Sequence, residues 1–150
     1  MQRITRLIAT FFFIGYFPYI PGTIASLAGL GLFLLFKNNA ALYILTVLLV
    51  ILGFYFSDKA ERDLKIKDAQ VIVIDEAVGM LLSLIMLPQA RVTGWVLFFV
   101  FLAFRIFDWT KPYPIRKLQE LKGGLGIMSD DILAAVYTVI VFQVFFKFVS

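Results

Sequence analysis

Apolar residues fill most of the chain in long blocks, and short polar stretches separate these blocks. Five blocks stand out as candidate membrane segments, at residues 23–36, 41–56, 71–87, 93–107 and 132–149. A straight helix needs about 20 residues to cross the hydrocarbon core of a bilayer, with a lower limit of roughly 17. Because several blocks are shorter, the pattern predicts an all-α polytopic membrane helix bundle of four to five spans. The first block, which follows Pro21 and Gly22, either crosses the bilayer or enters it partway.

The composition is that of a membrane protein. Hydrophobic residues make up 61% of the 150 residues and the mean hydropathy is +0.93, above the roughly half-apolar composition of soluble domains. No polar linker or internal repeat interrupts the pattern, so residues 1–150 are expected to form one integral-membrane domain. The basic and then apolar N-terminus resembles a signal peptide, but no small-residue cleavage site follows, so we expect it to be retained.

Charged residues fall unevenly on the two predicted faces. If the N-terminus is cytoplasmic and all five segments cross, ten Lys and Arg residues lie on the cytoplasmic side. The opposite side carries three, which are Lys37, Arg91 and Lys147. This bias follows the positive-inside rule. All ten acidic residues also fall at or inside the predicted cytoplasmic face, which topology alone does not require.

Asp75 and Glu76 interrupt the apolar run VIVIDEAVGMLLSLIML. A charged side chain near the centre of a membrane helix costs roughly 2.5 to 3.5 kcal/mol on insertion scales, so two adjacent carboxylates need a partner. A bound cation is the simplest one. The alternative is that Asp75 caps a helix whose lipid-embedded part begins at Glu76, which leaves Glu76 unexplained.

Arg105, Asp108 and Lys111 follow one another at intervals of three in FRIFDWTKP. On a helix this spacing places consecutive members side by side on one face, and Pro112 should end the helix just beyond. We therefore expect a stripe of positive, negative and positive charge at the membrane-exit end. The alternative is a pair between Arg105 and Asp108 that is neutralised within the helix, with Lys111 extended toward the lipid headgroups.

Three polar segments have simple structural explanations. In GGLGIMSDDILAAVY, Ser129 or Asp130 would cap the last predicted span, and acids there complement the helix dipole. In PGTIAS, Thr23 would cap the first span, and the free amide groups of that turn form an anion pocket. The segment 57–68, which joins the second and third predicted spans, is typical of a solvated surface helix.

Together these motifs place carboxylates from three predicted helix ends, and at least two basic groups, at one interface. Mg²⁺ prefers oxygen ligands and is usually held by one or two carboxylates together with water and phosphate oxygens of the substrate. Lys and Arg side chains neutralise a phosphoryl group. The arrangement predicts a site for a divalent cation and a phosphate. A different function, that of a small cation-coupled transporter or channel subunit, would instead distribute acids through the membrane depth or on both faces.

Four segments, PGTIASL, VIVIDEAVG, FRIFDWTKPYPI and GGLGIMSDDILAA, resemble the phosphatidylglycerophosphatase A family in this order and spacing. The resemblance runs from about Pro21 to Ala135. It implies a Mg²⁺-dependent lipid phosphatase of the bacterial inner membrane, multi-pass, with its active site at the cytoplasmic face. The implied reaction converts phosphatidylglycerophosphate to phosphatidylglycerol and phosphate. Expected partners are the membrane and an anionic phospholipid substrate, with no nucleic acid.

The same resemblance implies the roles of individual residues. The implied metal ligands are Asp75, Glu76, Asp108, Asp130 and Asp131. The implied substrate contacts are Thr23, Ser26, Arg105 and Lys111. Asp108 and Asp131 are the implied catalytic residues.

Residue types that the chain lacks narrow the chemistry further. Without Cys there is no cysteinyl-phosphate, and without His there is neither a phosphohistidine nor a histidine general acid. Two routes remain. In one, a carboxylate beside Mg²⁺ deprotonates the water that attacks phosphorus; in the other, an acid attacks directly and forms an acyl-phosphate. Asp108 is the predicted base or nucleophile, because Arg105 and Lys111 flank it.

Overall fold

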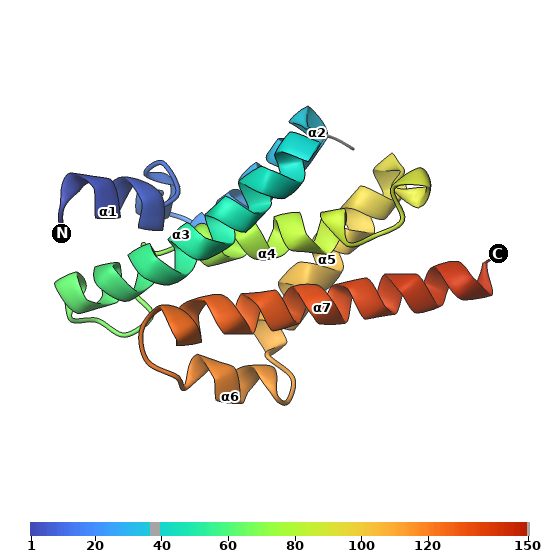
Figure 1. The fold of residues 1–150 in the computed structure, drawn as a ribbon. Coiled ribbons are helices and arrows are strands. Elements are labelled where there is room, and N and C mark those ends of the chain that lie inside the picture. Colours follow the sequence, from blue (N-terminus) through green and yellow to red (C-terminus); the bar gives the residue numbers. More distant parts are fainter. Residues whose placement is uncertain (37–39, 150) are drawn as a thin grey trace.

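Seven α-helices account for most of the described residues, which are 1–36 and 40–149 of this computed structural model (Figure 1). They are α1 (Arg3–Ala9), α2 (Pro21–Leu35), α3 (Ala40–Leu64), α4 (Ile74–Ile85), α5 (Gly94–Thr110), α6 (Ile115–Gln119) and α7 (Gly124–Phe148). Short 3-10 turns lie at Ile14–Tyr16 and Gln89–Arg91. No strand occurs in the described ranges, so the all-α prediction is confirmed. Lys37, predicted on the opposite face, lies outside the described residues.

Two helices, α3 and α7, are long and apolar enough to cross a membrane. Each has 25 residues, which corresponds to about 37 Å at a rise of 1.5 Å per residue. On α3 the side chains of Ile44, Val47, Ile51 and Tyr55 are between 58% and 62% exposed. Their spacing of three and four places them on one face. Helix α3 therefore turns an apolar stripe toward its surroundings and not toward the core.

Helix boundaries differ from the apolar blocks at three places. Residues 57–64 continue α3 without a break, so the surface helix predicted over 57–68 is the last part of α3 and ends at Leu64. Helix α4 begins at Ile74, which leaves the first residues of the predicted segment 71–87 outside it. Helix α7 begins at Gly124, so the paired acids of the last motif lie inside the helix and not at its start.

Helix α4 is the centre of the fold. Most of its 12 residues are buried, and it packs against α2, α3, α5 and α7 (Figure 1). Its buried side chains, among them Met80 and Leu84, join Phe104 of α5 in the main hydrophobic core. As a result, the first turn of α4, which carries Asp75 and Glu76, is enclosed by other helices.

Helix α2 lies close along α4 because Gly29 has no side chain. A Cβ atom at Gly29 would overlap the backbone carbonyl of Ala77. The close approach continues to the start of α2, where Gly22 lies directly against the carboxylate of Glu76. The packing of two apolar helices thus brings a helix N-terminus beside the predicted acidic site.

Candidate active site

Three carboxylates from two helices meet at one end of the bundle. Asp75 and Glu76 stand in the first turn of α4, and Asp131 stands on α7. One carboxylate oxygen from each residue lies within 4.8 Å of the other two. Oxygen ligands at such separations can surround a single small cation. The packing of α4 against α7 therefore creates a site that neither helix contains alone.

Each of these carboxylates has one buried oxygen without a hydrogen-bond partner in the described part of the chain. The three atoms are Asp75 Oδ1, Glu76 Oε2 and Asp131 Oδ2. Buried carboxylates without compensation are costly, and a coordinated metal ion is one way in which proteins offset this cost. A hard cation such as Mg²⁺ takes carboxylate and water oxygens as ligands. The donor set and its unpaired oxygens therefore fit the predicted magnesium site.

Asp108 lies beside this cluster, near the end of α5. Its carboxylate forms an ion pair of 2.8 Å with Nη1 of Arg105, and Asp131 is a close neighbour. The same Nη1 donates a hydrogen bond of 3.3 Å to Ser26 Oγ on α2. Because both contacts use Nη1, the second terminal nitrogen of Arg105 remains able to contact a phosphate oxygen.

Lys111 pairs with a residue of another helix and does not continue the stripe on α5. The helix ends at Thr110, and Lys111 adopts a left-handed backbone with φ of 42°. Its Nζ donates to Asp130 Oδ2 at 2.5 Å. Burial lowers the pKa of Lys111, but the charge of Asp130 and this hydrogen bond outweigh burial, so the pKa lies above its ordinary value. Lys111 therefore keeps its positive charge at neutral pH.

The structure contradicts the alternative explanation in which Thr23, Asp75 and Ser129 or Asp130 cap the starts of helices. Helices α2, α4 and α7 follow Ile20, Val73 and Gly123, and no side chain of these residues caps them. The candidate capping residues stand inside the helices instead, and they are Thr23, Asp75, Ser129 and Asp130. Because the helices begin earlier than the sequence suggests, the side chains of the acids turn toward neighbouring helices.

A cavity of about 340 Å³ opens beside Glu76. Its lining residues are Pro18, Ile20, Pro21, Gly22, Thr23, Gln70, Glu76, Arg105 and Trp109. Gly22 and Thr23 belong to the first turn of α2, where the backbone amide groups have no acceptor within the helix. Trp109, at the other wall, is 84% exposed. The cavity thus combines groups that bind anions with an apolar rim.

Replacing Gly22 by alanine should lower kcat/KM for the substrate by about 100-fold. A displacement of catalytic groups by about 1 Å can slow an enzymatic reaction by this factor. A Cβ atom at this position would overlap Oε1 of Glu76. The Glu76 carboxylate would have to shift, which disturbs its arrangement with Asp75 and Asp131 and weakens the cation site. Phosphate release measured over a range of Mg²⁺ concentrations checks this, and the half-saturating concentration should rise.

Gly94→Ala is the matched control, since a Cβ atom at Gly94 meets no atom within 4 Å. It should leave both kcat/KM and the Mg²⁺ dependence unchanged. Equal activity of Gly22→Ala and wild type would show that the position of Glu76 is unimportant for turnover.

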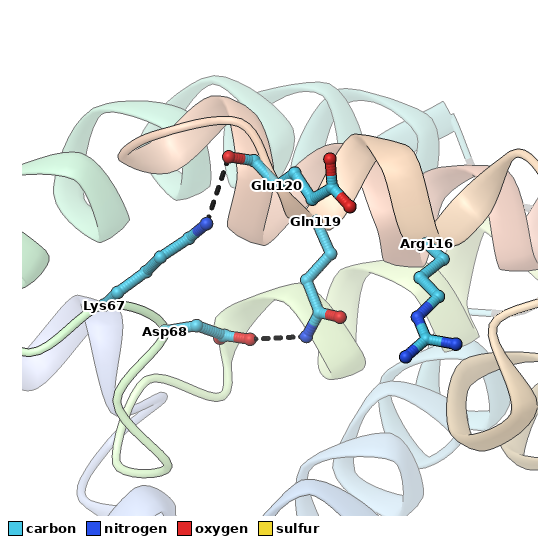
Figure 2. A pocket seen from close by; sticks show the side chains of 5 residues that line it. All are labelled: Lys67, Asp68, Arg116, Gln119 and Glu120. Atoms are coloured by element: carbon cyan, nitrogen blue, oxygen red, sulfur yellow. Dashed lines mark hydrogen bonds between the residues drawn. The ribbon is translucent and has the colours of Figure 1, made fainter.

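A second cavity, of about 370 Å³, lies between the loop after α3 and helix α6 (Figure 2). Figure 2 shows two hydrogen bonds that cross it. Lys67 Nζ donates to the carbonyl oxygen of Glu120 at 3.0 Å, and Gln119 Nε2 donates to Asp68 Oδ2 at 2.9 Å. These bonds brace α6 against the loop that leads into α4. Arg116 also lines this cavity.

Sequence analysis missed two residues that shape the site. Glu61 accepts hydrogen bonds from the backbone amides of Gly123, at 2.8 Å, and of Asp68, at 3.1 Å. It therefore holds the turn that precedes α7, although its segment looked like a solvated surface. Gln70 lines the first cavity. The position of Glu61 close to a predicted span was the available signal, and nothing in the sequence singled out Gln70.

Comparison with known proteins agrees with these motifs. A sequence profile of the family described as phosphatidylglycerophosphatase A matches residues 7–146. Phosphatidylglycerophosphatase A of Haemophilus influenzae is 42% identical over 140 residues, which cover 91% of this chain and 85% of that protein. Phosphatidylglycerophosphatase A of Escherichia coli is 39% identical over 143 residues, which cover 91% of this chain and 80% of that protein.

A third relative carries a different name. A protein of Bacteroides thetaiotaomicron, provisionally named phosphatidylinositol-3-phosphatase, is 37% identical over 145 residues, which cover 92% of this chain and 91% of that protein. No solved structure matches the chain. The profile match over nearly the whole length, and the two relatives that share its name, show that the chain belongs to the phosphatidylglycerophosphatase A family of phosphatases.

Proposed function

We propose that this protein removes the terminal phosphate of phosphatidylglycerophosphate in a Mg²⁺-dependent hydrolysis that yields phosphatidylglycerol and phosphate. The observation that carries the proposal is the convergence of three carboxylates beside the pair of Arg105 and Asp108, where each of the three has one buried oxygen without a partner in the described part of the chain. Two relatives named for this activity support the choice of substrate. The predicted location of all acids on one membrane face does not favour the alternative, a small cation-coupled transporter or channel subunit.

Asp75, Glu76 and Asp131 would hold the magnesium ion through the oxygens that lack partners. Mg²⁺ bound there supplies positive charge that neutralises phosphate oxygens and makes a water molecule easier to deprotonate. The protein contributes a fixed set of oxygens that needs little rearrangement to receive the ion.

Asp108 is the general base in this mechanism, because it lies next to the carboxylate cluster and is held by Arg105. It accepts the proton of the water that attacks phosphorus. Arg105 keeps the Asp108 carboxylate in place through Nη1 and contacts a phosphate oxygen through its other terminal nitrogen. Lys111, paired with Asp130, adds positive charge near the transferred group.

The cavity beside Glu76 would receive the headgroup. The first-turn amides of α2 at Gly22 and Thr23 suit an anionic oxygen, and Trp109 with Ile20 forms an apolar rim. A lipid can leave its acyl chains in the bilayer while its phosphate enters this cavity. An active site at the membrane surface therefore matches a lipid substrate.

A membrane arrangement follows from this placement. We infer four to five spans in a bacterial inner membrane, with α2, α4 and α5 inside the bilayer beside α3 and α7, and with the acidic site at the cytoplasmic face. Exposed apolar side chains on α5 support this, and they are Trp95, Phe98, Phe99, Leu102 and Ile106. Reporter proteins fused after Lys67 and after Arg91 should lie on opposite sides of the membrane, and the same side for both would exclude five spans.

The function is tested by phosphate release from purified full-length protein in detergent micelles. Phosphatidylglycerophosphate should be hydrolysed at least about tenfold faster than phosphatidylinositol 3-phosphate or phosphatidic acid, and only with Mg²⁺. Faster turnover of phosphatidylinositol 3-phosphate would indicate that this lipid is the preferred substrate, in agreement with the name of the Bacteroides relative. Absence of phosphate release from all three lipids would reject the proposal.

A further inference from the structure

The first 20 residues form a distinct surface unit, of which only the last residues reach the proposed active site. We refer to residues 1–20, which comprise α1 and the loop that follows it, as the N-terminal collar. Helix α1 packs on α3 (Figure 1). The loop exposes a run of large apolar and aromatic side chains, which are Phe12, Phe13, Tyr16, Phe17, Tyr19 and Ile20. Tyrosine side chains such as those of Tyr16 and Tyr19 are typical of a membrane–water interface, and the exposed phenylalanines beside them suit its apolar side.

The backbone conformation of the loop exposes the side chains of Phe12 and Phe13 on the protein surface. Phe11, Phe12 and Phe13 all adopt left-handed backbone, with φ of 44°, 56° and 70°, which is unfavourable for residues with a side chain. Thr10 holds this turn, since its hydroxyl donates to the carbonyl of Arg6 at 2.7 Å and accepts from the amide of Phe13 at 3.1 Å. Phe12 and Phe13 are nevertheless 68% and 54% exposed. A strained turn that presents phenylalanine outward suits an apolar environment.

A groove of about 460 Å³ runs along α1 and ends at this turn. Its lining residues are Arg3, Ile4, Arg6, Leu7 and Phe13. Arg3 and Arg6 are three residues apart, so they lie next to each other on the helix. Neither forms an ion pair in the described part of the chain, and Asp63, one of the acids on the neighbouring helix α3, pairs instead with the N-terminal amine. The groove therefore offers two uncompensated guanidinium groups beside an apolar wall.

We propose that this groove is a binding site for an anionic phospholipid that is separate from the substrate site. The lipid phosphate would contact Arg3 and Arg6, and an acyl chain would lie along Ile4, Leu7 and Phe13. Basic residues attract anionic lipids close to a membrane surface. The apolar wall distinguishes a lipid from free phosphate, which would gain nothing from these side chains. Binding here does not depend on the proposed reaction.

The collar also touches the backbone on both sides of the proposed active site. The amide of Val73 donates to the carbonyl of Ala9 at 3.0 Å, and Gly15 lies so close to the carbonyl of Val71 that a Cβ atom would overlap it. Val73 directly precedes α4, which carries Asp75 and Glu76. The other end of the collar, Ile20, directly precedes α2 and lines the substrate cavity. A lipid that holds the collar thereby steadies the starts of both helices.

The test uses full-length protein in neutral detergent micelles doped with phosphatidylserine or, at the same mole fraction, with phosphatidylcholine. Phosphatidylserine is anionic but has no phosphate monoester, so it is not a substrate. Native mass spectrometry should find it retained on the wild-type protein well above phosphatidylcholine. Arg3→Gln/Arg6→Gln should reduce this retention at least about tenfold, and a large excess of inorganic phosphate should not displace the lipid.

Lys65→Gln/Lys122→Gln is the matched control, because it removes two exposed charges that do not line the groove. Its lipid retention should equal that of wild type. Arg3→Lys/Arg6→Lys, which keeps the charge, should restore most of the retention and so separates lost binding from misfolding. Equal retention of both lipids by wild type, or an equal loss in the Lys control, would overturn the proposal.

Turnover provides a second readout, which rests on the proposed function. Phosphatidylserine should raise the kcat of wild type in neutral micelles by about threefold or more and leave that of Arg3→Gln/Arg6→Gln unchanged. If the lipid is retained by wild type without any change in kcat, the binding site stands and its positioning effect on α2 and α4 is rejected. Failure of all phosphate release, by contrast, would reject the proposed function without affecting the retention result.

Discussion

Asp108→Asn should lower kcat for phosphatidylglycerophosphate by about 100-fold or more while changing KM only a few-fold. Removing a general base typically lowers the reaction rate by about 10²- to 10⁴-fold. The amide of asparagine cannot take a proton from water, but its oxygen still accepts a hydrogen bond from Arg105, whose present distance to Asp108 is 2.8 Å. The phosphate contacts and the fold should therefore persist. Steady-state phosphate release at saturating Mg²⁺ measures the effect.

Asp63→Asn is the matched control for this variant. Asp63 lies on α3 and forms an ion pair of 3.8 Å with the N-terminal amine, so it belongs to the collar side of the molecule. The same chemical change there should keep kcat within about twofold of wild type. If Asp108→Asn retains more than roughly a third of wild-type turnover with an unchanged unfolding temperature, Asp108 is neither base nor nucleophile. Hydroxylamine trapping separates the two roles, because only a nucleophilic Asp108 gives an acyl-phosphate to trap.

Removing divalent cations should abolish activity, with a loss of at least about 100-fold that Mg²⁺ reverses. A metal ion contributes several kcal/mol of transition-state stabilisation, and each 1.4 kcal/mol corresponds to about a tenfold change in rate. Asp75, Glu76 and Asp131 each carry one buried carboxylate oxygen without a partner in the described part of the chain. The measurement is phosphate release after chelation, followed by titration with Mg²⁺. Full activity in the chelated protein would exclude a magnesium-dependent mechanism.

Binding of the ion should also be visible without turnover. A ligand that binds the folded state at about 100 times its Kd adds about 2.7 kcal/mol of stability, so Mg²⁺ should raise the unfolding temperature by several degrees. Asp131→Asn should lose most of this increase, whereas Asp63→Asn should keep it. An equal increase in both variants would mean that Mg²⁺ binds somewhere other than the proposed cluster.

The helical class and the acidic end of the molecule were predictable from sequence for simple reasons. A long continuous apolar block in a membrane satisfies its own backbone hydrogen bonds when it forms a helix, and acids such as Asp75 and Glu76 stand out against such blocks. The boundaries were harder to predict. Residues 57–64, which are mostly polar, continue α3 because tertiary contacts stabilise the longer helix. One of these contacts is the hydrogen bond that Glu61 accepts from the turn before α7.

The sequence indicated which acidic residues belong to the site. It could not indicate which side chains each of them contacts. Neighbouring residues of an α-helix point about 100° apart, so Asp130 and Asp131 face different surroundings on α7. Asp130 pairs with Lys111, and Asp131 joins Asp75 and Glu76 of α4. Sequence spacing alone does not distinguish Asp130 from Asp131, because it contains no information on which neighbouring helix each side of α7 faces.

By itself, the sequence determined a helical, membrane-like chain of the phosphatidylglycerophosphatase A family with its acids concentrated in a few motifs. Only the tertiary structure decided that Asp75, Glu76 and Asp131 converge, that Arg105 joins Asp108 to Ser26, and that the collar braces the start of α4. The physical reason is that hydrophobic pattern and helix propensity act locally along the chain. The choice of partner depends on how apolar faces of distant helices pack, and close contacts at Gly22 and Gly29 set that packing.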